Sequence, residues 1–168
     1  MNKEDHVLNA VLLGVGIAVL MDTSLSAGTL ENVFRVGVPI ALGALFPDID
    51  TAFGVHRKTF HNLPVLAGFV AFPLLFGNLY FVWIGVATHY VLDLLGTKGG
   101  MALLYPYPGL FDVPVGVTVD SKKATVVTLA VTAVELAAVA LVVDAGYTVL
   151  LGAPGVRDAF FEFASSVA

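Results

Sequence analysis

The sequence contains no cysteine. Disulfides, thiolate metal ligands, iron–sulfur clusters and a cysteine nucleophile are therefore excluded, and any transition metal must be bound by the 4 histidines or the 13 acidic residues. Charged residues are also scarce, at 12%, whereas hydrophobic residues make up 58% of the chain. Soluble globular domains carry about 25% charged residues, so this chain has too few to cover a water-facing surface. The composition argues against a soluble enzyme, a disordered tail and a nucleic-acid-binding module, and it predicts an integral membrane protein.

Stretches without Asp, Glu, Lys or Arg predict where the chain crosses the membrane. We expect an all-α bundle of about five transmembrane helices, forming one domain over residues 1–168. The predicted spans are residues 7–21, 33–46, 62–76, 79–95 and 124–151. Residues 97–123 are predicted to form a loop with a short strand, because valines alternate at 115, 117 and 119. Residues 155–167 are predicted to form an amphipathic helix at the membrane interface.

Under this topology, Lys and Arg residues are distributed unequally between the two sides of the membrane. One side carries Lys3, Arg57, Lys58, Lys98, Lys122 and Lys123, and the other carries Arg35 and Arg157. Because positive residues favour the cytoplasmic side, we expect a multi-pass protein of the inner membrane with a cytoplasmic N-terminus. All four histidines fall on or near the same cytoplasmic face.

A pair of potential metal ligands lies near the end of the fourth predicted span. His89 and Asp93 are four residues apart, which places both side chains on one face of a helix, about one turn from each other. A structural hydrogen bond would explain an isolated pair of this kind. Ionisable groups are costly inside or at the rim of a membrane helix, however, so a functional role is the better interpretation.

Further candidate ligands occur at three other points on the cytoplasmic face. Asp48 and Asp50 follow the second span; they are either a turn-forming pair, or a metal ligand and a carboxylate that orients a histidine. His56 lies in the next loop, and His61 lies at the mouth of the third span, where we expect Asn62 to cap the helix. His6 precedes the first span and, taken alone, would be an interfacial anchor. Together these residues indicate a site built from histidines and carboxylates.

The order of these motifs resembles a known family. The series is His6, then Leu45-Phe46-Pro47-Asp48-Ile49-Asp50, His56-Arg57-x-x-x-His61, Thr88-His89-x-x-x-Asp93, Gly99-Gly100 and Leu103-Leu104-Tyr105-Pro106. It is similar to the YdjM-like, LexA-binding, inner-membrane-associated metal-dependent hydrolases, and more distantly to zinc-dependent phospholipase C. Two positions differ from the family pattern, since Phe60 stands where the family usually has threonine and Asn62 where it has serine.

The resemblance implies a divalent metal site, most simply one or two zinc ions. Its implied ligands are His6, Asp48, His61, His89 and Asp93, with His56 as an additional candidate. We expect Asp50 to act as a general base. Arg57 and Lys58 are either a clamp for substrate phosphate, with Arg57 binding bidentately, or only topology signals and headgroup anchors.

Two functional hypotheses follow. In the first, the protein is a membrane-embedded hydrolase that acts on a phosphoester of a lipid or lipid-linked substrate at the cytoplasmic face. In the second, the protein is not catalytic, and a structural metal site supports docking of a cytoplasmic protein partner. A cation transporter is disfavoured, because the candidate ligands lie at one face and no inverted repeat is visible.

Glu135, in the middle of the last span, is expected to be structural and to pair with Ser, Thr or Arg35.

Overall fold

The computed structural model describes residues 2–96, 99–113 and 122–150, with side chains as far as residue 143 in the last segment. In this part of the chain the secondary structure is helical, apart from an isolated bridge between Met101 and Phe111. The long helices are α1 (Lys3–Met21), α2 (Ala27–Leu45), α4 (Leu63–Phe76), α5 (Val82–Leu95) and α6 (Lys122–Leu150). Two short helices, η1 (Pro47–Ile49) and α3 (Asp50–Phe53), follow α2. The predicted all-α fold class is confirmed.

Side-chain caps determine where the first helices begin. Asn2 caps α1, so the charged residues before the first apolar stretch already belong to that helix. Ser26 and Thr29 form a capping box at the start of α2. Both helices therefore begin several residues before the predicted spans, which marked only the apolar parts. Asn62 caps α4 through its side chain, as predicted.

The helices differ in their capacity to cross a bilayer. Three segments of the described chain are long and apolar enough to do so: Lys3–Met21, Ala27–Phe53 and Lys123–Val143. Helices α4 and α5 have 14 residues each, which corresponds to a rise of about 21 Å, less than the ~30 Å hydrocarbon core of a membrane. The α4–α5 pair is thus a short hairpin beside three longer helices, and five complete crossings remain a prediction.

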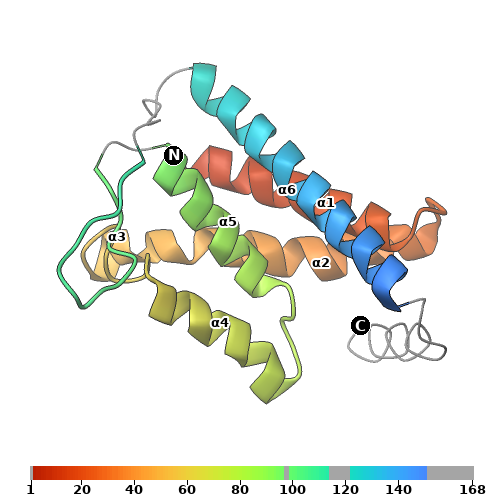
Figure 1. Cartoon of the computed structure of the whole chain (residues 1–168), viewed down its shortest axis with the longest axis horizontal. Helices are drawn as coiled ribbons and strands as arrows, with labels where there is room; N and C mark the ends of the chain where they lie inside the picture. Colours follow the sequence, from red (N-terminus) through yellow and green to blue (C-terminus); the bar gives the residue numbers. More distant parts are fainter. Residues whose placement is uncertain (1, 97–98, 114–121, 151–168) are drawn as a thin grey trace.

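Helix α2 packs between α1 and α5, and α6 lies along α1 (Figure 1). The helices α1 and α2 approach closely at two glycines, since a Cβ atom on Gly14 would lie 2.6 Å from the Cα atom of Gly37. The buried apolar cluster around this contact consists of Ala10, Leu13, Ile17, Val36, Ile40 and Ala44. The backbones of α2 and α5 are closest at two glycines. A Cβ atom on Gly85 would lie 1.9 Å from the Ile40 carbonyl oxygen, and one on Gly43 would lie 2.0 Å from the Val82 carbonyl oxygen.

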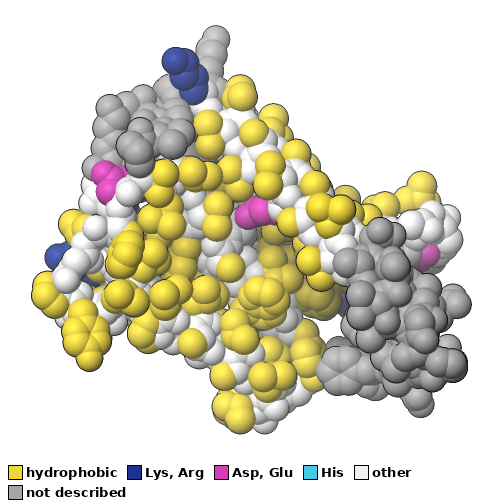
Figure 2. All heavy atoms as spheres, viewed as in Figure 1, with side chains coloured by type: hydrophobic (Ala, Val, Ile, Leu, Met, Phe, Trp, Pro, Cys, Tyr) yellow, Lys and Arg dark blue, Asp and Glu magenta, His cyan; other side chains and the backbone are white. Residues whose placement is uncertain are grey.

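Large hydrophobic side chains cover much of the surface (Figure 2). Phe34 on α2, Leu74 and Leu75 on α4 and Leu141 on α6 are all exposed. A soluble protein would bury such residues, whereas a membrane protein exposes them to lipid. The strand predicted around residues 115–119 and the amphipathic helix predicted at residues 155–167 lie outside the described residues.

Candidate metal centre

All the predicted metal ligands come together at one end of the bundle. His6 lies in the first turns of α1, Asp48 lies in η1 after α2, His61 precedes α4, and His89 and Asp93 lie on α5. The His89 Nε2 atom is 3.7 Å from Asp48 Oδ1, although the two residues are far apart in the sequence. Whether these side chains bind a metal stays a prediction.

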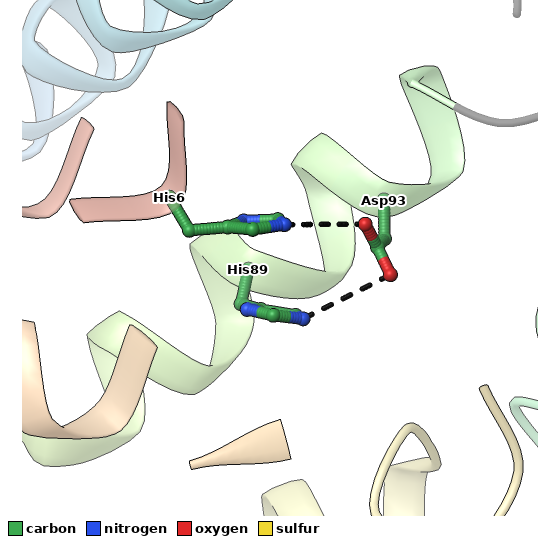
Figure 3. A group of neighbouring side chains, drawn as sticks. All are labelled: His6, His89 and Asp93. Atoms are coloured by element: carbon green, nitrogen blue, oxygen red, sulfur yellow. Dashed lines mark ion pairs between the residues drawn. The ribbon is translucent and has the colours of Figure 1, made fainter. Parts of the chain in front are cut away.

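One half of the cluster is formed by α1 and α5 (Figure 3). His6 Nε2 lies 3.2 Å from Asp93 Oδ1, and His89 Nε2 lies 3.8 Å from Asp93 Oδ2. The imidazole rings of His6 and His89 are stacked, with centroids 3.8 Å apart. All three side chains are almost completely buried, yet neither ring nitrogen of His6 makes a well-formed hydrogen bond. Buried polar atoms of this kind are normally satisfied, so the arrangement suits a bound ligand.

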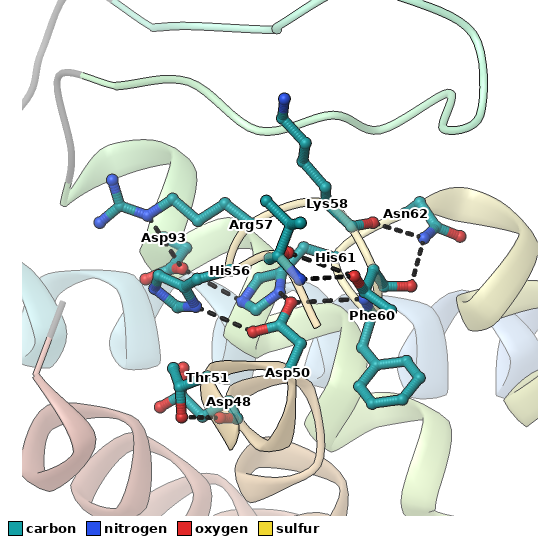
Figure 4. Close-up of polar contacts among 12 residues, drawn as sticks. Asp48, Asp50, Thr51, His56, Arg57, Lys58, Phe60, His61, Asn62 and Asp93 are labelled. Atoms are coloured by element: carbon teal, nitrogen blue, oxygen red, sulfur yellow. Dashed lines mark hydrogen bonds and ion pairs between the residues drawn. The ribbon is translucent and has the colours of Figure 1, made fainter. Parts of the chain in front are cut away.

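The other half of the cluster is organised by Asp50 (Figure 4). One Asp50 oxygen accepts a hydrogen bond from His56 Nδ1 at 3.0 Å, and the other accepts from His61 Nδ1 at 2.8 Å. Asp50 is fully buried, whereas the His56 side chain is 40% exposed. A second group of potential ligand atoms belongs to Asp48, His56 and His61. This half of the cluster therefore reaches the surface.

The Nε2 atoms of His61 and His89 face each other at the centre of the cluster. The Ala44 carbonyl oxygen can only accept, so His89 Nδ1 donates to it, at 2.6 Å. His61 Nδ1 likewise donates to Asp50, and in both neutral rings the lone pair is then on Nε2. These two Nε2 atoms are only 3.1 Å apart. A shared cation or proton between them would stabilise this contact.

Acidic neighbours dominate the electrostatics of His61. Burial alone would lower the pKa of this imidazole, but the Asp93 and Asp50 carboxylates outweigh burial, and the pKa is raised above its ordinary value. The His61 Nε2 atom lies 3.4 Å from Asp93 Oδ2. The surrounding negative charge thus favours a positive charge at this position, whether a proton or a metal ion.

The backbone next to His61 is fixed by Tyr90. The Tyr90 hydroxyl donates to the carbonyl oxygens of Phe60 and Asn62, on either side of the histidine. The Phe60 N–H also points at Asp50 Oδ2, at 3.4 Å. Although the Phe60 side chain has no hydroxyl group, its backbone N–H donates to the carboxylate. Nothing in the sequence indicated this role of Tyr90.

Arg57 lies at the edge of the cluster. Its side chain is 27% exposed, and Nε is 3.9 Å from Asp93 Oδ2. The residue adopts a left-handed backbone conformation, with φ of 64°, which is uncommon for a residue other than glycine. Its carbonyl oxygen accepts a hydrogen bond from the Ala102 N–H, at 3.0 Å, so the loop of residues 99–113 is tied to it.

A separate polar network lies deeper in the bundle. Glu135 on α6 accepts hydrogen bonds from Thr88 on α5 and from the Asn9 amide on α1, the latter at 2.8 Å. Thr132 accepts from the same amide at 2.9 Å. Pairing with threonine was predicted, whereas pairing with Asn9 was missed, although Asn9 follows His6 by three residues on the same helical face. Thr88 precedes His89, so the network begins one residue from the cluster.

Comparison with known proteins identifies the family. Residues 1–156 match the family of the YdjM inner membrane protein. The chain belongs to this family. No curated protein and no solved structure matches the chain.

The part of the chain that matches the YdjM family includes every residue of the cluster. Membership and the three long apolar helices together support a location in the membrane.

Proposed function

We propose that the protein is a membrane-embedded, metal-dependent hydrolase that cleaves a phosphoester of a lipid or lipid-linked substrate. The observation that carries this proposal is the spacing of the ligand atoms. Two ligands bound tetrahedrally to zinc at about 2.0–2.1 Å are about 3.3–3.4 Å apart. The Nε2 atoms of His6, His61 and His89 and the carboxylates of Asp48 and Asp93 form contacts of 3.1–3.8 Å. The potential ligand atoms form two groups: His6, His89 and Asp93 in the first, and Asp48, His56 and His61 in the second. Each group could hold one zinc ion, so the set suits one or two ions.

The half-open edge of the cluster favours a reactive site over a purely structural one. Asp48 is 12% exposed and His56 is 40% exposed, so water and a substrate headgroup can approach from this side. A zinc ion with an open coordination position lowers the pKa of bound water and polarises a phosphoryl oxygen.

Arg57 and Asp50 would then have distinct roles. The Arg57 guanidinium can bind non-bridging phosphate oxygens bidentately from its position beside Asp93. Asp50, proposed as a general base from the sequence, is buried with both oxygens engaged by His56 and His61. This environment favours the alternative role, in which the carboxylate orients the histidines and raises their basicity.

Hydrolysis of lipid phosphoesters is the decisive test. We expect zinc-loaded protein in detergent to cleave at least one member of a panel of phospholipids and isoprenoid phosphates, and a chelator to abolish the reaction. Asp50→Asn should lower the rate about 10–100-fold, the usual cost of losing a residue that orients a metal ligand. Lys3→Gln, which removes an exposed charge from the first turn of α1, at the same end of the bundle, is the control and should retain the activity.

The family resemblance also suggests LexA binding and a relation to zinc-dependent phospholipase C, and both remain proposals. If zinc-loaded protein cleaves no substrate in the panel, yet binds a cytoplasmic protein in a manner that requires His89, the docking function replaces the hydrolase. The metal is then structural.

We further propose that the cluster faces the cytoplasm, with the N-terminus on the same side. The excess of Lys and Arg on that side supports this orientation. Single cysteines introduced next to Lys122 and Gly155 should respond oppositely to a membrane-impermeant thiol reagent applied to intact cells, with only the second labelled. Labelling of both positions from outside would contradict the proposed topology.

A further inference from the structure

A second cleft lies at the opposite end of the bundle from the metal cluster. It has a volume of about 220 Å³ and is enclosed by the end of α1, the first half of α2 and the turn between α4 and α5. Its polar lining comes from Asn32, Arg35 and Tyr80, and Met21, Val36 and Phe81 contribute to its apolar lining. A cleft with one positive charge and apolar walls has the composition of a site for an amphiphilic anion.

The cleft is located where the short hairpin ends. Helix α4 ends at Phe76, and the turn that follows leads into α5 at Val82. Because α4 and α5 rise only about 21 Å, their turn lies beside Asn32, Arg35 and Val36, in the middle of α2, and not beside the first turn of α2. This difference in length leaves the cleft at a depth that lipid headgroups or upper acyl chains of the opposite leaflet can reach.

Arg35 has no partner within the described part of the chain. Glu31 lies one turn earlier on α2 but forms no ion pair with it, and the Asp22 carboxylate accepts hydrogen bonds from Thr29, Ser24 and Ser26 instead. An unpaired guanidinium at membrane depth is unfavourable. The positive-inside rule does not explain Arg35 either. Topology signals are the Lys and Arg residues of the cytoplasmic side, and Arg35 is one of only two positive residues expected on the opposite side.

We propose that this cleft binds the phosphate group of an anionic ligand, with Arg35 as its main contact. The guanidinium would donate two parallel hydrogen bonds to phosphate oxygens. The Asn32 amide and the Tyr80 hydroxyl line the same cleft and can donate to the remaining oxygens. An acyl chain attached to the phosphate would lie against the apolar lining. The site is independent of the proposed hydrolase, since it is built from other residues at the other end of the bundle.

Native mass spectrometry of the full chain in a non-ionic detergent tests the proposal. Phosphatidylglycerol is titrated, and the affinity of the first bound molecule is compared between the native chain and Arg35→Gln. We expect a loss of about tenfold or more, the factor that corresponds to removing hydrogen bonds from a charged group. Arg35→Lys should restore part of the affinity, since it keeps the charge but not the two parallel donors.

Two charge variants serve as controls. Lys3→Gln removes a positive charge at the other end of the bundle, and Glu31→Gln changes a charge one turn from Arg35; neither should weaken binding.

Asn32→Phe keeps the charge of Arg35 but fills the cleft, so it should also weaken binding. This variant tests the site even if Arg35→Gln fails to fold. Competition with inorganic phosphate identifies the source of the anion: displacement of the lipid indicates a free phosphate site, and no displacement indicates a lipid site. Equal binding by the native chain and Arg35→Gln, or an equal loss in Lys3→Gln, would overturn the proposal.

Discussion

Replacing both His89 and Asp93 with alanine is expected to abolish zinc binding by the protein. These two residues offer candidate ligand atoms from successive turns of α5, and the Asp93 carboxylate lies 3.2 Å from His6 Nε2 and 3.4 Å from His61 Nε2. Loss of a residue that only orients a ligand already costs about 10–100-fold in metal affinity. Loss of two ligands should therefore lower zinc affinity by far more than a hundredfold. The measurement is the zinc content of purified protein after reloading with zinc and removal of the free ion.

Val91→Ala is the matched control for this experiment. Val91 lies between the two ligands on α5 but is 40% exposed, so its truncation leaves the cluster intact. Zinc content should remain at one or two ions per chain in this variant. If the native chain and the double variant retain equal amounts of zinc, or if the native chain takes up none after reloading, the cluster does not bind zinc.

The local features of the site were predictable from the sequence. The four-residue spacing of His89 and Asp93 places both on one helical face, and the Asn62 cap follows from the preference of asparagine for that position. The grouping of His6, Asp48 and His61 with this pair was expected from the shared cytoplasmic end of the helices and from the family resemblance. These inferences depend on local geometry and on the alternation of helices across a membrane.

The contacts that orient the ligands were only partly predictable. The bond from His89 to the Ala44 carbonyl oxygen involves a backbone group, which no side-chain pattern reveals. A carboxylate that orients a histidine was one alternative for Asp48 and Asp50. The pairing of Asp50 with two histidines at once, however, depends on the path of the chain from α3 to α4, where Arg57 adopts a left-handed conformation. Apolar stretches located α4 and α5, but lack of charge does not measure helix length, so the sequence did not indicate that these two helices are shorter than the other three.

Close packing of α2 and α5 connects the fold to the site. Gly85 lies one turn before His89, and it permits the approach to Ile40 and Ala44 that brings the Ala44 carbonyl oxygen within 2.6 Å of His89 Nδ1. Small residues at such crossings are typical of helices packed in membranes. A larger residue at this position should therefore disturb both the stability of the bundle and the orientation of the ligand.

Gly85→Ala is accordingly expected to destabilise the protein, and Gly68→Ala is expected not to. The new methyl group at position 85 would lie 1.9 Å from the Ile40 carbonyl oxygen and 2.6 Å from the Ala44 nitrogen, both backbone atoms that cannot move without separating the helices. Overpacking of this kind costs about 1–3 kcal/mol and occasionally more.

The control variant makes the same substitution in α4, where a Cβ atom on Gly68 would meet nothing within 4 Å. There the higher helix propensity of alanine should instead stabilise the protein, by about 0.5–1 kcal/mol. Thermal unfolding in detergent should therefore give shifts of opposite sign for the two variants, and Gly85→Ala should also bind zinc more weakly, because the Ala44 carbonyl oxygen moves away from His89. Equal unfolding temperatures for the two variants would show that the α2–α5 contact is not as close as the structure indicates.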